Sequence, residues 1–246
     1  MDPLFSLEVI LIGIGGGLAA SIAALASLVS YPALLALGLP PVMANISNTV
    51  AQIAGGAGMV YGSRAELAHQ HRRIPYVAGA ALLGGAAGSA LLLATPADAF
   101  EKAVPWLIGC ASIAVLLPKP AAGKPVRHPT RILFIGTAVI SVYSGYFGAA
   151  SGVVVLALLL RILDDTLPQI IALKNVAAAT ANTVAGVWFI CTVHLEWHII
   201  IPLAIGFLIG GRVGPIIVRH APTHLLRTVI AVLGVGLAIK LGINAY

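Results

Sequence analysis

Long apolar stretches without charged residues make up most of the chain, and short charged clusters separate them. No Lys, Arg, Asp or Glu occurs within residues 9–63, 74–97, 103–118, 132–160 or 175–195. A helix needs about 20 apolar residues to cross the roughly 30 Å hydrocarbon core of a membrane, and most of these stretches approach or exceed that length. Because they are continuously apolar instead of alternating, they predict spanning helices and not the strands of a barrel.

The two halves of the chain resemble each other at an offset of about 127 residues. Asn48 falls on Asn175 at an offset of 127, and the glycine pattern of residues 84–88 falls on that of residues 210–214 at an offset of 126. These matches keep their order along the chain, whereas chance similarity between glycine-rich sequences would be scattered over many offsets. The pattern predicts a duplicated membrane unit.

Cations in the loops predict that the two repeats have opposite orientations. Lys and Arg gather in residues 64–73, 119–131 and 219–227, whereas residues 95–102 carry one cation and residues 194–198 carry none. Short cytoplasmic loops collect Lys and Arg, and here a cation-rich loop of one repeat corresponds to a cation-poor loop of the other. This reversal is typical of the inverted-topology repeats of secondary transporters.

The expected fold is an all-α polytopic membrane protein built from two inverted repeats. The first repeat covers residues 1–118, the second covers residues 131–246, and residues 119–130 form a proline-containing cytoplasmic linker. Inversion requires an odd number of crossings, so we expect about five membrane segments in each repeat, with both chain ends outside. The first helices of each repeat have little room to cross twice, and we expect them to be broken or re-entrant. Eight transmembrane helices are the alternative.

Composition supports the membrane interpretation and narrows the possible functions. Hydrophobic residues make up 59% of the 246 residues, charged residues make up 9%, and the mean hydropathy is +1.02, values that exclude an ordinary soluble domain. The net charge of +6 does not indicate nucleic-acid binding, because the cations border apolar stretches. Cys110 and Cys191 lie inside apolar stretches, and His194 and His198 lie at an expected membrane interface, so no disulfide, metal site or cofactor is predicted.

Glycines interrupt the apolar pattern in each half, at residues 13–17 and at Gly145, Gly148 and Gly152. Such stretches favour broken helices, whose free backbone N–H groups lie at the positive end of a helix dipole and can bind an anion at membrane depth. Glycine also permits close packing of intact membrane helices, so both interpretations stay open.

A polar helix is expected to follow each interruption. In the first half, four hydrogen-bonding side chains recur at the i, i+3, i+4, i+7 spacing that places them on one helical face, and the second half contains a counterpart that begins beside a lysine. Single asparagines of this kind often only join helices, but two such faces at a repeat interface favour substrate binding. The candidate substrate-binding residues are Asn45, Ser47, Asn48, Thr49, Gln52, Ser151, Lys174, Asn175 and Asn182.

Lys174 is the strongest candidate in this set. It opens an uncharged stretch beside Asn175, and its compact charge suits an anion. We expect Lys174 to meet Asn48 and Asn175 in one hydrated cavity; a lysine that extends toward the membrane surface is the alternative. For Arg212, a surface position or a phosphate contact is favoured over guidance of the substrate.

Several short motifs match one transporter family. Residues 143–152 read YSGYFGAASG and resemble a Y-D-G-x-x-G-P-G-T-G element, and residues 171–182 resemble the polar helix start that follows it. In the first half, YPALL at 31–35, GLPP at 38–41 and ANISN at 44–48 resemble a P-x-L-L, G-x-P-P and A-x-x-T-N pattern. Over nearly its whole length the chain resembles the TauE/SafE sulfite exporter family of membrane transporters.

The resemblance implies a secondary transporter that exports a small inorganic or organic sulfur anion, such as sulfite or an organosulfonate, across a bacterial inner membrane by alternating access. Membrane lipid is a further expected partner, a homo-oligomer is compatible with the sequence, and nucleic acid is not expected. Residues 24–27 and the Lys174–Asn175 pair depart from the family pattern, which has glycines and a Thr-Lys pair there. A passive anion channel or an importer of a related anion is the alternative. An intramembrane enzyme is less favoured, because neither H-E-x-x-H nor G-x-S-x-G occurs.

Overall fold

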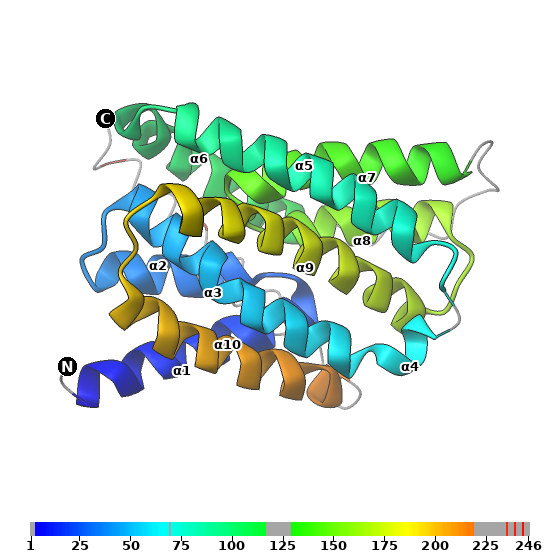
Figure 1. Cartoon of the computed structure of the whole chain (residues 1–246), viewed down its shortest axis with the longest axis horizontal. Helices are drawn as coiled ribbons and strands as arrows, with labels where there is room; N and C mark the ends of the chain where they lie inside the picture. The colour runs from blue at the N-terminus through cyan, green and yellow to red at the C-terminus, as the bar shows by residue number, and fades with distance from the viewer. Residues whose placement is uncertain are drawn as a thin grey trace.

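The computed structural model describes residues 3–68, 70–116 and 129–218, together with positions 235, 239 and 243. Within these residues the chain forms helices and no strand, as the apolar stretches predict (Figure 1). The first half contains α1 (Pro3–Ala23), α2 (Ala26–Ala36), α3 (Pro41–Gly62), α4 (Arg64–Leu67), α5 (Ile74–Ala94) and α6 (Ala97–Leu116). The second half contains α7 (Pro129–Tyr146), α8 (Ser151–Ile162), α9 (Leu167–Thr192) and α10 (Trp197–Val218). Most of the expected linker and most of the stretch after Val218 lie outside the described residues.

Four of the described helices are long and apolar enough to cross a membrane. They are α1, α5, α9 and α10, with apolar windows at Leu4–Ser21, Ile74–Ala94, Leu167–Thr192 and Trp197–Gly214. Helix α3 has 22 residues, a length of about 33 Å at 1.5 Å per residue, but its polar side chains lower its hydropathy. The 11 residues of α2 and the 12 of α8 are too few to span. The total number of crossings stays a prediction.

The α1–α2 hairpin and the α7–α8 hairpin enter the bundle from opposite ends (Figure 1). The N-terminus and the α2–α3 and α9–α10 connections lie at one end, whereas α4 and the start of α7 lie at the other. Helix α2 turns back toward the end from which α1 starts, and α8 turns back toward the end from which α7 starts. Helix α1 packs along α10, α5 packs along α7, and α3 contacts both α9 and α10.

Helix α1 is continuous through residues 13–17, so the predicted interruption at these glycines is wrong. The glycines instead let the α1 backbone approach α10: a Cβ atom at Gly17 would lie 2.7 Å from the carbonyl oxygen of Phe207. Close packing of small residues, the other interpretation of this stretch, explains them. The first-half break lies farther along the chain, at Ala24, whose φ of 60° is in the left-handed region.

The predicted interruption in the second half is confirmed. Helix α7 ends at Tyr146 and α8 begins at Ser151. Between them, Gly148 and Ala150 have φ angles of 76° and 56°, a left-handed backbone that glycine adopts without steric cost. In both halves, a long helix is therefore followed by left-handed backbone and by a short helix that turns back.

The connection between α5 and α6 is shorter than the expected loop at residues 95–102. Helix α6 already begins at Ala97, directly after Pro96. Asp98 lies in its first turn, where a carboxylate interacts favourably with the positive end of the helix dipole. The acidic residues of this cation-poor region therefore belong to the start of a helix.

Candidate substrate-binding site

The two helix breaks meet inside the bundle, beside a polar pocket. A Cβ atom added to Gly152 of α8 would lie 2.6 Å from the Cβ of Ala24, so the two breaks are in direct contact. The cavity at this point has a volume of about 30 Å³, close to the share of liquid volume of one water molecule, so a larger ligand requires the surrounding helices to move apart. Its polar lining comprises Ser27, Thr49, Gln52, Ser144, Ser151, Lys174 and Asn182.

Two short helices begin at this pocket. Helix α2 starts at Ala26 and α8 at Ser151, and the second residue of each, Ser27 and Gly152, lines the pocket. Among the described residues, neither the Ser27 nor the Gly152 backbone N–H has a backbone acceptor. The N-terminus of a helix carries a partial positive charge of roughly half an elementary charge. The two helix starts therefore provide a favourable place for an anion.

Lys174 adds a full positive charge to the same pocket. It lies two turns into α9, its side chain is 3% exposed, and its Nζ donates a 3.3 Å hydrogen bond to the carbonyl of Ala20. No carboxylate pairs with Lys174 in the part of the chain that the structure describes. A buried ammonium without a counter-charge is costly at membrane depth. Because the side chain is buried against α1, the structure does not favour a lysine that extends toward the membrane surface.

Five of the nine candidate residues line the pocket: Thr49, Gln52, Ser151, Lys174 and Asn182. The Nδ2 of Asn182 donates a 3.1 Å hydrogen bond to the Oε1 of Gln52, which joins α9 to α3. The Nε2 of Gln52 donates to the Oγ of Ser27 at 3.4 Å. Side chains from both halves of the chain therefore form one connected polar surface.

Asn48 and Asn175 lie outside the pocket lining and join helices instead. Asn48 donates a 3.2 Å hydrogen bond to the Oγ of Ser27 in α2, and Asn175 donates a 3.0 Å hydrogen bond to the Oγ of Ser63 at the end of α3. The expectation that both asparagines meet Lys174 in one cavity is therefore wrong. The cause is the rotation of α3 and α9, which turns these two side chains toward neighbouring serines.

Asn45 and Ser47 also lie outside the pocket lining. Asn45 donates a 2.9 Å hydrogen bond to the carbonyl of Tyr146, so it fastens α3 to the α7–α8 break. Ser47 is fully buried in the same helix. For these two residues the structure supports a contribution to helix packing, which is the ordinary role of polar side chains in membrane helices.

Ser27 and Ser144 are pocket residues that the sequence pattern did not single out. Ser27 stands in the second position of α2, and the Oγ of Ser144 lies 3.1 Å from the Oγ of Ser151. Each stands where the sequence departs from the family motifs, Ser27 in place of a glycine run and Ser144 in place of the aspartate of Y-D-G. These departures were the available signal, because each serine adjoins a helix break.

Three aromatic rings pack together beside the pocket, toward one end of the bundle. Phe147 lines the pocket and meets Tyr31 edge to face, with ring centroids 5.2 Å apart. Phe100 of α6 contacts Phe147 on another side, at 5.9 Å between centroids. The rings come from α2, the α7–α8 break and α6, so both halves of the chain contribute to this contact.

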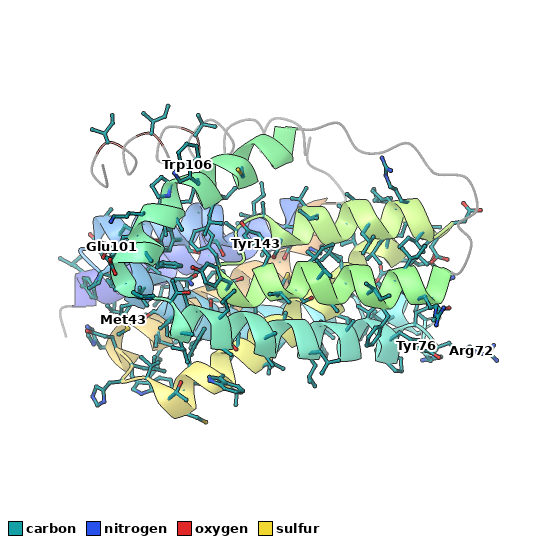
Figure 2. All side chains as sticks on the ribbon, turned by 90° about the horizontal axis from the view of Figure 1, so that it is seen from above. Met43, Arg72, Tyr76, Glu101, Trp106 and Tyr143 are labelled. Atoms are coloured by element: carbon teal, nitrogen blue, oxygen red, sulfur yellow. The ribbon has the colours of Figure 1, made fainter. Side chains whose placement is uncertain are left out.

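An ion pair joins the two halves at the opposite end. Arg73, just before α5, pairs with Asp165 in the connection between α8 and α9. Figure 2 shows this end of the bundle, with Arg72 and Tyr76, opposite the end that carries Glu101. The pocket thus lies between an aromatic contact at one end and a charged contact at the other.

Apolar helices around a buried polar pocket are the arrangement of a membrane transport protein. Comparison with known proteins agrees with this class and identifies the family. The chain belongs to the sulfite exporter TauE/SafE family, whose sequence model matches residues 9–241. It is therefore a membrane-embedded member of a transporter family.

Curated relatives cover most of the chain. A Haemophilus influenzae protein named "Probable membrane transporter protein" is 24% identical over 217 residues, which cover 87% of this chain and 85% of the relative. The Escherichia coli K12 "Probable membrane transporter protein YfcA" is 24% identical over 250 residues, which cover 98% of this chain and 91% of the relative. No solved structure matches the chain.

Proposed function

We propose that the chain is a secondary transporter that exports a small sulfur-containing anion, such as sulfite or an organosulfonate, across the bacterial inner membrane. The observation that carries this proposal is Lys174, whose buried ammonium faces the pocket without a carboxylate partner among the described residues. The starts of α2 and α8 adjoin the same pocket. One full and two partial positive charges favour an anion over a cation or a neutral solute. Membership of the sulfite exporter family supports a sulfur anion.

The proposed binding mode combines charge with several converging donors. Lys174 has three N–H donors, of which the Ala20 carbonyl takes one. Gln52 and Asn182 each use one side-chain N–H within the pocket and keep a second. Together with the helix starts, these donors come from different directions. They suit the three oxygen atoms of a sulfite or sulfonate group better than the flat pair of a carboxylate.

We infer that the site opens alternately toward the two ends of the bundle as one repeat moves against the other. The proposed moving parts are the inverted repeats at residues 1–118 and 131–246. Reciprocal packing supports the pseudo-symmetry of the two repeats, since α1 packs along α10 just as α7 packs along α5, and movement of one repeat against the other must slide these contacts. The Tyr31–Phe147 contact and the Arg73–Asp165 ion pair are the proposed outer and inner gates.

Membrane potential is the proposed driving force for export. The long apolar stretches contain no Asp or Glu, so they do not provide the carboxylate relay that many proton-coupled transporters use. An inside-negative potential expels an anion with about 2.3 kcal/mol per charge per 100 mV, or about 4.6 kcal/mol for a dianion. At tenfold per 1.4 kcal/mol, that difference favours efflux of a dianion by about three orders of magnitude.

Counterflow in proteoliposomes tests the proposal. Vesicles preloaded with unlabelled sulfite, sulfate, thiosulfate, sulfoacetate or acetate are diluted into labelled sulfite, and uptake of the label is followed. We expect saturable counterflow with sulfite or sulfoacetate inside and little with acetate. Flux that does not saturate would indicate a channel, and chemical conversion of the probe without transport would indicate an enzyme. Counterflow with none of the sulfur anions would contradict the proposal.

A further inference from the structure

Two arginines share one exposed tyrosine ring where α3 and α10 end together. The Cζ of Arg64 lies 4.8 Å and the Cζ of Arg212 lies 5.5 Å from the ring centroid of Tyr61. Arg64 also donates a 3.0 Å hydrogen bond to the Tyr61 hydroxyl. Close helix packing brings the two arginines together, since a Cβ at Gly58 would lie 3.4 Å from the backbone nitrogen of Arg212. Both guanidinium groups therefore lie within 5.5 Å of the same ring centroid.

No carboxylate forms an ion pair with either arginine in the part of the chain that the structure describes, and the nearest in sequence is Glu66, two residues after Arg64 in α4. Neither Arg64 nor Arg212 forms an ion pair there, and Asp165, at the same end of the bundle, is paired with Arg73. Residues 117–128 and 219–246 contain no Asp or Glu. Two guanidinium groups on one ring repel each other, and an anion that contacts both would relieve this repulsion. Their planar donor groups match the oxygens of a phosphate.

The surface beside the arginines is apolar and faces outward. Ile205 and Leu208 are 46% and 44% exposed, and with Arg212 they follow the i, i+3, i+7 spacing that shares one face of a helix. Helix α10 is one of the membrane-spanning candidates. This face therefore presents hydrocarbon-facing side chains along its length and a pair of cations at its end, which matches the shape and charge of a phospholipid.

We propose that Tyr61, Arg64 and Arg212 bind the phosphate headgroup of one anionic phospholipid, whose acyl chain lies along Ile205 and Leu208. The lipid reaches this site from the membrane leaflet at the end of the bundle that carries Arg72 and α4 (Figures 1 and 2). Arg64, Arg72 and Arg73 belong to the cation-rich loop at this end, which is the expected cytoplasmic side. The site is separate from the substrate pocket, none of whose lining residues it includes.

Native mass spectrometry of the full-length protein tests this site. The detergent-solubilised protein is incubated with equimolar phosphatidylglycerol and phosphatidylcholine of identical acyl chains, and the ratio of the two adducts is measured. We expect the wild type to prefer phosphatidylglycerol. Arg64→Gln and Arg212→Gln should each lower the ratio roughly fivefold, the equivalent of about 1 kcal/mol per arginine, and the double variant should abolish the preference.

Arg72→Gln is the matched control, because Arg72 is an exposed arginine at the same end that does not contact Tyr61. Since each adduct ratio comes from one spectrum, partial misfolding of a variant lowers both adducts in proportion and leaves their ratio unchanged. The proposal is overturned if Arg72→Gln lowers the ratio as much as Arg64→Gln and Arg212→Gln do. It is also overturned if soluble glycerol phosphate displaces phosphatidylglycerol at equal concentration, since the ligand would then be a free phosphate and not a lipid.

Discussion

The two helix breaks at the pocket are built from different residues. The α7–α8 break passes through two left-handed residues, Gly148 and Ala150, whereas the α1–α2 break passes through Ala24 without a glycine. A left-handed conformation costs a residue other than glycine about 1–2 kcal/mol. The first break is therefore held in place by the packing around it, and the second is favoured in part by its own sequence.

The two halves also differ in charge at the pocket. The second half contributes Lys174, whereas the equivalent position at an offset of 127 residues is Ser47, which does not line the pocket. Both halves contribute a short helix that begins there. The helix starts are thus shared between the halves, but the full positive charge belongs to one of them. We infer that anion affinity depends mainly on the second half.

The most decisive test of this comparison is whether the halves are inverted. Single cysteines at Lys124 and after Tyr246, in a background without the exposed Cys110 and Cys191, should react with a membrane-impermeant thiol reagent from opposite sides of the membrane. We expect labelling from opposite sides because a cation-rich loop of one repeat corresponds to a cation-poor loop of the other. If both cysteines react from the same side, the two repeats of five segments are ruled out.

The next largest effect is expected from Lys174→Met, which removes the charge and keeps a side chain of similar length. Loss of one charge-assisted contact of about 1.5–3 kcal/mol should weaken anion binding by roughly 10–100-fold. The measurement is the concentration of sulfite that half-saturates counterflow. Lys102→Met, at an exposed position of α6, is the control and should bind like the wild type. If both variants weaken anion binding equally, Lys174 acts only through the net charge of the protein and not by contact with the anion.

The sequence predicted the class of fold because long uncharged stretches have few solutions other than membrane helices. It placed the second-half break correctly, since Gly148 stands in a recognisable motif. It misplaced the first break, because glycines that pack against another helix and glycines that interrupt a helix look alike until the partner helix is known. Asn48 and Asn175 were assigned to the cavity for a similar reason. A spacing of i, i+4 shows which side chains share a face, and only tertiary packing determines what that face meets.

A smaller effect is expected from Gly152→Ala, which places a methyl group where the two breaks touch. Its Cβ would lie 2.6 Å from that of Ala24, so the two short helices must move apart. Overpacking of this kind costs about 1–3 kcal/mol, and we expect a lower free energy of unfolding and slower counterflow. Gly15→Ala is the control, because its Cβ would meet Val29 at an ordinary 3.6 Å. If Gly15→Ala lowers the free energy of unfolding and the counterflow rate as much as Gly152→Ala does, contact between the two breaks is not the cause of the loss.

The smallest effect is expected from Ala24→Gly, and its sign is the informative part. Glycine removes the left-handed strain of about 1–2 kcal/mol at this position, while its greater freedom in the unfolded chain costs about 0.4–1 kcal/mol. The variant should therefore be more stable by up to about 1.6 kcal/mol, as measured by unfolding in mixed micelles. Ala150→Gly, at a φ of 56°, should also be more stable, whereas Ala87→Gly at an exposed interior position of α5 should lose about 1 kcal/mol of unfolding free energy.

If Ala24→Gly loses as much unfolding free energy as Ala87→Gly, the methyl group of Ala24 stabilises its contact with Gly152 by more than its backbone strain costs. The first break would then be held by that contact between the two halves.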